Sequence, residues 1–327
     1  MKRRVFLSSA LMVAAGVRLA RAQSGSAPIE RTAQTPTLDI GYVESGNANG
    51  FPVILLHGFP DDVHAYDEVA PPLARAGHRV LVPYLRGYGS TRFRDPKMPR
   101  RAEQAAIGQD VIDFADALRL PRFAVAGYDW GGRAAQIAAA LHPDRVRAGV
   151  FVAGYSIQDV FSAPRPAAPQ VEAAFWYMYY FNTERGRAGL AQNRKELCKL
   201  LWQQWSPTWK FADATYDATA RSFDNPDFVD CVIHSYRHRN FNAPGEPRFV
   251  EIEKRLAERP PIAVPVITLH GTDDAFGRPS IDISAADRAV MPRLIEKRMV
   301  ADAGHFVPHE KPEAVAQALI DLLERAK

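Results

Sequence analysis

Short apolar runs alternate with longer amphipathic segments along most of the chain. Apolar runs and alternating positions predict strands at 38–44, 53–56, 80–82, 123–126, 146–152, 265–269 and 294–300. Apolar residues at helical spacing predict helices at 64–76, 102–118, 133–141 and 312–326. A strand followed repeatedly by a helix is typical of an α/β protein, in which helices cover both faces of a mostly parallel sheet.

The alternation stops between residues 154 and 261. This stretch contains four of the five tryptophans and many other aromatic residues in helical surroundings, together with several prolines. Because ligands bind at the carboxyl ends of parallel strands, a helical insertion that splits the sheet is expected to form a cap over an active site. We therefore predict a core of residues 38–153 and 262–327 and a helical cap of residues 154–261.

Residues 1–22 have the features of a signal peptide. Arg3 and Arg4 precede an apolar stretch too short to span a bilayer, and small residues lead to an expected cleavage site after Ala22. We expect a periplasmic or secreted protein whose mature chain has no stable membrane insertion. The paired arginines resemble a twin-arginine signal, although a general secretory signal has a similar form. Residues 23–37 are polar and contain proline, which predicts a linker.

Charge and composition exclude some partners. The chain of 327 residues carries a formal charge of +4, of which five positive charges lie in the first 22 residues without any acid, leaving −1 for the remainder. A nearly neutral body argues against nucleic acid. Cys198 and Cys231 either form a disulfide or remain buried thiols. No cysteine or histidine has the spacing of metal ligands, so we expect no metal and no cofactor.

A glycine-rich motif around Asp129 carries the clearest chemical signal. Gly-Tyr-Asp-Trp-Gly-Gly, residues 127–132, lies between a predicted strand and a predicted helix. Such a turn exposes the side chain at its centre, and the small flanking residues allow it to close. The helix N-terminus favours an ionised carboxylate. A carboxylate displaces a leaving group at tetrahedral carbon, so we expect Asp129 to form an alkyl ester.

Hydrolysis of that ester requires a base and a stabilised oxyanion. His305 follows the last predicted strand, and Asp274 follows the preceding one, so His305 is the expected base and Asp274 its orienting acid. The turn of His-Gly-Phe-Pro at 57–60 would aim the Phe59 N–H, with that of Trp130, at the oxyanion.

These motifs together resemble the epoxide hydrolase and haloalkane or haloacetate dehalogenase branch of the α/β-hydrolase fold, from about residue 38 to residue 326. The Leu-Arg-Gly-Tyr-Gly-Ser run at 85–90 and the Gly-His-Phe motif at 304–306 also carry the resemblance. Tyr84 is a departure, because this branch usually has an acid before that run.

The resemblance implies three further roles, which we state as expectations. Epoxide hydrolases protonate the opening oxygen with two cap tyrosines, which Tyr177 and Tyr236 match. Dehalogenases bind the halide with N–H donors, for which Trp130 and Trp176 are candidates. Trp130, Trp176 and His57 are expected to contact substrate. Arg133 matches one arginine of the haloacetate branch, yet its place in a predicted helix equally suits a solvated residue.

The leading hypothesis is an epoxide hydrolase that converts a small apolar epoxide into a vicinal diol. The alternative is a haloalkane or haloacetate dehalogenase acting on a halogenated substrate. A third hypothesis is an exported α/β-hydrolase scaffold that binds a ligand without catalysis. The presence of a nucleophile, a base, an acid and oxyanion donors argues against a pure binding protein.

Overall fold

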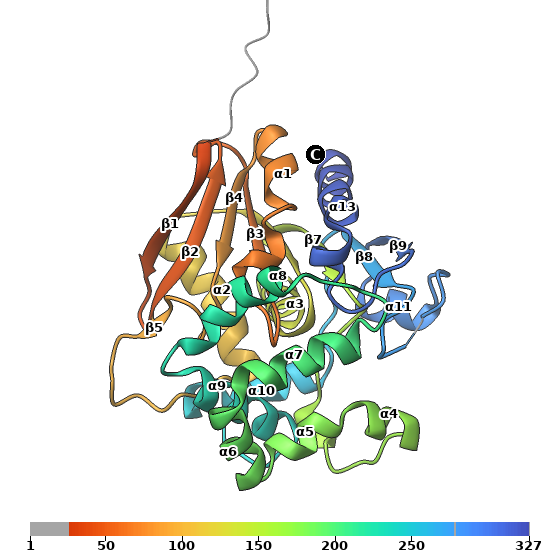
Figure 1. Ribbon diagram of the computed structural model, residues 1–327. Coiled ribbons are helices and arrows are strands. Elements are labelled where there is room, and N and C mark those ends of the chain that lie inside the picture. Colours follow the sequence, from red (N-terminus) through yellow and green to blue (C-terminus); the bar gives the residue numbers. More distant parts are fainter. Residues whose placement is uncertain (1–25, 278, 327) are drawn as a thin grey trace, which may run out of the picture.

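The computed structural model describes residues 26–277 and 279–326 (Figure 1). The predicted signal peptide lies outside these residues. Within them, one sheet of nine strands has the order β1-β2-β4-β3-β6-β7-β8-β9, and β5 pairs with β2. The strands are β1 Ser26–Gln34, β2 Leu38–Gly46, β3 Pro52–Leu56, β4 Arg79–Pro83, β5 Arg92–Phe93, β6 Phe123–Gly127, β7 Val146–Val152, β8 Val266–Gly271 and β9 Leu294–Val300. Neighbouring strands from β4 to β9 run parallel, whereas β1 and β2 are antiparallel. This is the α/β-hydrolase fold that the sequence predicts.

Helices cover both faces of the sheet. Helices α1 and α13 contact each other on one face, and α2 packs against α3 on the other (Figure 1). The helices of the core are η1 Val63–Tyr66, α1 Ala70–Arg75, α2 Gln104–Ala117, α3 Asp129–Leu141, α11 Ala285–Val290, α12 Val307–Glu310 and α13 Pro312–Arg325. Strands β3 and β6 are buried along almost their whole length because both of their faces are covered.

A group of short helices separates β7 from β8 and gathers at one end of the sheet (Figure 1). They are η2 Val160–Ser162, α4 Pro169–Ala174, α5 Trp176–Phe181, α6 Glu184–Gln192, α7 Arg194–Trp205, α8 Asp213–Ala220, η3 Arg221–Asp224, α9 Phe228–Arg239, η4 Pro247–Phe249 and α10 Val250–Ala257. Cys198 on α7 and Cys231 on α9 are both buried free thiols. No helix in the described part of the chain is long and apolar enough to cross a membrane.

Two local predictions were wrong. The segment expected as a linker forms strand β1, which pairs with β2 through its backbone and therefore needs no apolar alternation. As an edge strand it leaves Ile29 exposed and joins Arg31 to Glu44 by an ion pair of 2.9 Å. The helix expected at 64–76 divides into η1 and α1, because consecutive prolines fall in the first turn of α1, where they are tolerated, and not within a helix.

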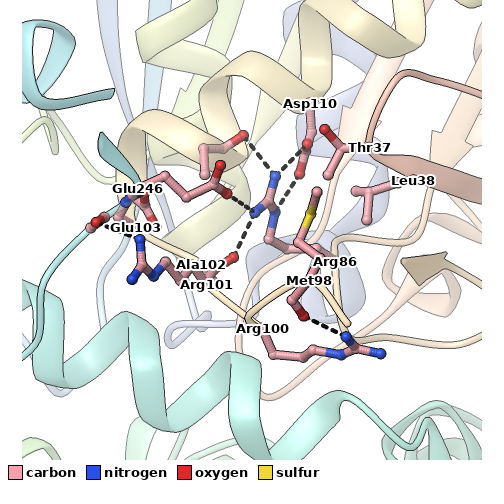
Figure 2. A network of polar contacts seen from close by, with 12 residues as sticks. Thr37, Leu38, Arg86, Met98, Arg100, Arg101, Ala102, Glu103, Asp110 and Glu246 are labelled. Atoms are coloured by element: carbon pink, nitrogen blue, oxygen red, sulfur yellow. Dashed lines mark hydrogen bonds and ion pairs between the residues drawn. The ribbon is translucent and has the colours of Figure 1, made fainter. Parts of the chain in front are cut away.

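A buried ion pair joins the loop after β4 to the rest of the core. Arg86 donates Nε to Asp110 Oδ2 at 2.7 Å and Nη2 to Asp110 Oδ1 at 2.6 Å, and its Nη1 lies 3.7 Å from Glu246 (Figure 2). Since Asp110 lies on α2 and Glu246 precedes η4, the guanidinium links core and cap segments. Asp110 therefore provides an acidic partner for the Leu-Arg-Gly-Tyr-Gly-Ser run at 85–90, although Tyr84 stands where an acid usually precedes this run.

Candidate active site

The nucleophile candidate Asp129 lies at a strained turn between β6 and α3. Its φ is +50°, in the left-handed region that L-residues rarely adopt. The turn closes because the glycines at 127, 131 and 132 lack side chains. A Cβ on Gly131 would lie 2.1 Å from the His57 carbonyl oxygen, so only glycine fits there. The α3 helix begins at Asp129 itself, four residues earlier than the sequence pattern predicts.

Backbone donors hold the Asp129 carboxylate. The Phe59 N–H donates to Asp129 Oδ1 at 2.8 Å, and the Trp130 N–H also stabilises this carboxylate. Burial alone would raise the pKa of Asp129, but His305 and these two N–H groups hold it below its usual value. The carboxylate is therefore ionised, and its Oδ1 occupies the place where an oxyanion would form during ester hydrolysis.

His305 lies between two carboxylates at the carboxyl ends of the strands. Its Nδ1 is 3.3 Å from Asp274 Oδ2, and its Nε2 is 3.7 Å from Asp129 Oδ2. Nε2 is buried and has no hydrogen-bond partner among the described residues. Asp274 is held in turn by the Phe276 N–H at 2.9 Å from Oδ1. The structure thus brings together the nucleophile, base and acid that the sequence predicts.

The two carboxylates determine the charge of His305. Burial would lower the pKa of this imidazole, but Asp274 and Asp129 raise it to about 10. The free protein therefore holds an imidazolium between two carboxylates at neutral pH. Removing the charge of either carboxylate would lower this pKa.

Tyr177 and Tyr236 converge from two cap helices onto this site. Tyr177 on α5 and Tyr236 on α9 are 2% and 1% exposed, and their ring centroids are 5.4 Å apart. The Tyr236 ring is 5.4 Å from that of Phe59 and 5.5 Å from that of Trp130. Burial is the main cause that raises the pKa of both phenols above its usual value, so both remain protonated. The Tyr236 hydroxyl is buried without a well-aligned hydrogen-bond partner in the described chain.

The predicted substrate contact of His57 is wrong, and the indole N–H that Trp176 was expected to offer a substrate is engaged within the cap. His57 is fully buried; its Nε2 accepts from the Leu85 N–H at 3.0 Å, and its Nδ1 lies 2.9 Å from the Gly58 oxygen. Burial lowers its pKa to about 4, so it is a neutral structural residue. Trp176 points its indole N–H at Gln204 Oε1, 3.1 Å away on the exposed side of the cap. Neither side chain has a free donor for a substrate.

Arg133 is buried and is not the solvated helix residue that its position also allowed. Its guanidinium carbon lies 4.4 Å from the Trp130 ring centroid, and Nε donates to the Ser156 carbonyl oxygen at 2.8 Å. Its Nη1 is buried without a partner in the described residues. Burial and the nearby Arg239 lower its pKa to about 9. The Arg133 cation therefore packs against the indole of Trp130, the residue that follows Asp129.

Ser206 and Glu310, which no sequence motif points to, fix the histidine loop. Ser206, at the end of α7, accepts from the His305 N–H at 2.8 Å and donates to Glu310 at 2.6 Å. Glu310 also accepts from the Gly304 N–H at 2.9 Å. No sequence motif signals this contact, because cap and loop are about 100 residues apart. Among the described residues, no cluster of histidine, cysteine and acidic side chains could hold a metal ion.

Comparison with known proteins agrees with this architecture. The alpha/beta hydrolase fold family matches residues 52–312, and the chain belongs to this family. A crystal structure of a candidate epoxide hydrolase from Klebsiella pneumoniae is 44% identical, with a TM-score of 0.87 over 90% of this chain and 96% of that one. The protein is therefore a hydrolase.

Two curated relatives represent both branches of the resemblance. Epoxide hydrolase A of Mycobacterium tuberculosis is 27% identical over 333 aligned residues, which cover 91% of this chain and 98% of the relative. A haloalkane dehalogenase of Mycobacterium marinum is 35% identical over 125 residues, 37% of this chain and 40% of that protein. The first similarity extends over the cap as well as the core, whereas the second is local.

Proposed function

We propose that the protein is an epoxide hydrolase that opens a small apolar epoxide and releases a vicinal diol. The observation that carries this proposal is the pairing of two buried, protonated tyrosines beside the nucleophile. An epoxide oxygen stays attached to the substrate as it opens and becomes a strongly basic alkoxide, which needs a proton donor. Tyr177 and Tyr236 are the phenols within the cap that can provide it.

The first step forms an ester on Asp129. Oδ2, which faces His305 and is not held by Phe59, attacks an epoxide carbon. The carbon–oxygen bond breaks, and the ring oxygen takes a proton from a tyrosine while the second tyrosine donates a hydrogen bond. Aromatic rings of Phe59, Trp130, Phe181 and Trp205 surround the tyrosines and exclude water from this step.

The second step hydrolyses the ester and depends on the charge that the first step removes. Once Asp129 is esterified, His305 lies beside only one carboxylate, so its pKa falls and it can release its proton. That proton restores the tyrosine. The neutral imidazole then takes a proton from water, which attacks the ester carbon. The Phe59 and Trp130 N–H groups stabilise the oxyanion on Oδ1. The bond between the ester carbon and Oδ2 then breaks, and Oδ2 leaves on the diol with the remaining proton of the attacking water, so Asp129 is again a carboxylate and His305 an imidazolium.

Dehalogenation is the second candidate, supported by the local similarity to a haloalkane dehalogenase. A departing halide is a weak base and needs N–H donors rather than acids. Trp130 is one candidate donor, but the cap donor expected from Trp176 points at Gln204. The site therefore favours epoxide over halide.

Single-turnover alkylation of Asp129 in tyrosine variants tests the proposal. Tyr177→Phe and Tyr236→Phe alone should slow alkylation by an epoxide about 10-fold to 100-fold, and the double variant should nearly abolish it. Tyr179→Phe is the matched control, because Tyr179 lies on the same α5 helix but is 47% exposed. Wild-type alkylation in the double variant, with halide released from a haloalkane, would show a dehalogenase instead.

A further inference from the structure

A second buried carboxylate lies behind the oxyanion turn, outside the catalytic triad. Asp61 follows the Phe59-Pro60 dipeptide and is completely buried. Its backbone N–H donates to the Gly58 oxygen at 3.1 Å, which closes the turn that presents the Phe59 N–H. A buried carboxylate is costly unless it is paired and hydrogen-bonded, so its partners indicate what it holds.

The partners of Asp61 come from the other catalytic loops. Tyr128, the residue before the nucleophile, donates its hydroxyl to Asp61 Oδ2. His309, on α12 directly after the catalytic histidine loop, places Nε2 3.1 Å from Oδ1 and 3.0 Å from Oδ2. Burial would lower the pKa of His309, but Asp61 raises it above its usual value, because the carboxylate stabilises the charged imidazole.

Residues of the cap contact Asp61, His309 and the neighbouring Pro60. Thr219 on α8 donates to Asp61 Oδ1 at 3.4 Å, and the Trp202 indole N–H donates to the Pro60 oxygen at 2.7 Å. The rings of Trp202 and Trp209 lie 5.1 Å and 5.3 Å from that of His309. Asp61 is therefore in contact with the oxyanion turn, the nucleophile turn, the histidine loop and the cap at once.

We propose that Asp61, paired with His309 and Tyr128, is a positioning residue that holds the Phe59 N–H in line with Asp129. The turn of residues 57–60 is held at its start by the hydrogen bond from the Leu85 N–H to His57 Nε2. Asp61 holds the end of the same turn, where it accepts from Tyr128, the residue before the nucleophile. This role does not itself involve substrate contact. Its kinetic consequence rests on the proposed two-step reaction.

The two steps should respond differently when this anchor is lost. In alkylation the Phe59 N–H stabilises the Asp129 carboxylate before it reacts. Displacing this N–H should therefore slow alkylation little. In hydrolysis it stabilises a developing oxyanion, and loss of one such donor typically costs about 100-fold to 1,000-fold. A donor that is displaced rather than removed should cost roughly 10-fold to 100-fold.

Asp61→Asn tests the role, because it keeps the shape and removes the charge and one acceptor oxygen. We expect alkylation within about 3-fold of wild type and hydrolysis roughly 10-fold to 100-fold slower. The ester then accumulates, so kcat and KM fall together while kcat/KM is retained. Glu44→Gln is the matched control: it weakens the ion pairs with Arg79 and Arg31 at the start of β4, the end of the strand opposite to the catalytic loops, and should lower Tm without changing KM.

Further variants and an NMR measurement test the positioning role of Asp61 even if Asp61→Asn does not fold. If Asp61→Asn does not fold, His309→Gln and Tyr128→Phe each remove a single partner and should give the same pattern more weakly. In 15N-labelled protein the Phe59 amide proton should shift and exchange faster in Asp61→Asn but not in Glu44→Gln. The Phe59 amide signal is measured without substrate. If the wild type turned over no epoxide, the proposed function would be overturned, and the amide signal would still test the positioning role. An unchanged Phe59 amide, or equal slowing of both steps, would overturn the positioning role.

Discussion

Removing the charge of Asp129 should lower the pKa of His305, and the structure gives the size of the effect. Asp129 Oδ2 lies 3.7 Å from His305 Nε2. At an effective dielectric constant of about 20, two unit charges at this distance interact by about 4 kcal/mol. Asp129→Asn removes this attraction while Asp274 remains, so the pKa should fall from about 10 to about 7, because 1.36 kcal/mol corresponds to a pKa change of about 1.

The assay is an NMR titration of histidine-labelled protein, with the His305 signal assigned from the spectrum of His305→Gln. Asp116→Asn, which alters an exposed ion pair with Arg145, serves as the control and should leave the His305 pKa unchanged. The result matters because esterification removes the same charge and would convert His305 into a base. A pKa that stays near 10 in Asp129→Asn would refute this coupling.

Three further predictions follow from the same residues and from the N-terminal sequence. His305→Gln should still form the ester but hydrolyse it at least about 100-fold more slowly, so mass spectrometry should find a substrate-sized increment on the peptide that contains Asp129; equal loss of both steps would contradict this. The folded-state pKa of His305 is raised from 6.5 to about 10, so its stabilising effect is complete below pH 6.5 and is lost as pH rises toward 10. The difference in unfolding free energy between wild type and His305→Gln should therefore shrink over that range, and a constant difference in denaturant titrations would refute it. We propose export by the twin-arginine route, in which case replacing Arg3 and Arg4 by lysine should keep a fusion of residues 1–30 out of the periplasm; unchanged export would exclude that route.

The sequence predicts the parts of this fold that local patterns determine. The apolar runs of β3, β6, β7 and β8 identify the buried strands, because a parallel sheet covered on both faces needs nearly continuous apolar residues. The glycines around Asp129 identify the nucleophile turn, since only small residues fit there. Chain order then suggests His305 and Asp274, and the structure places His305 beside the nucleophile and Asp274 beside His305.

Contacts between distant segments could not be predicted in this way. Strand β1 is stabilised by backbone pairing with β2, which leaves no apolar signature. The neutral role of His57 depends on the Leu85 N–H, and the outward direction of Trp176 depends on Gln204. The Asp61–His309 pair joins residues 248 positions apart. In each case the partner decides the role, and sequence spacing does not reveal the partner.

The central claim is that Asp129 attacks the substrate and water then attacks the resulting ester. A single turnover with enzyme in excess over an epoxide, carried out in water enriched in oxygen-18, tests it most directly. The new diol oxygen should come from the Asp129 carboxylate, so the first diol should be unlabelled and the peptide containing Asp129 should gain about 2 Da. Label in the first diol together with an unlabelled Asp129 would show direct attack by water and contradict the account.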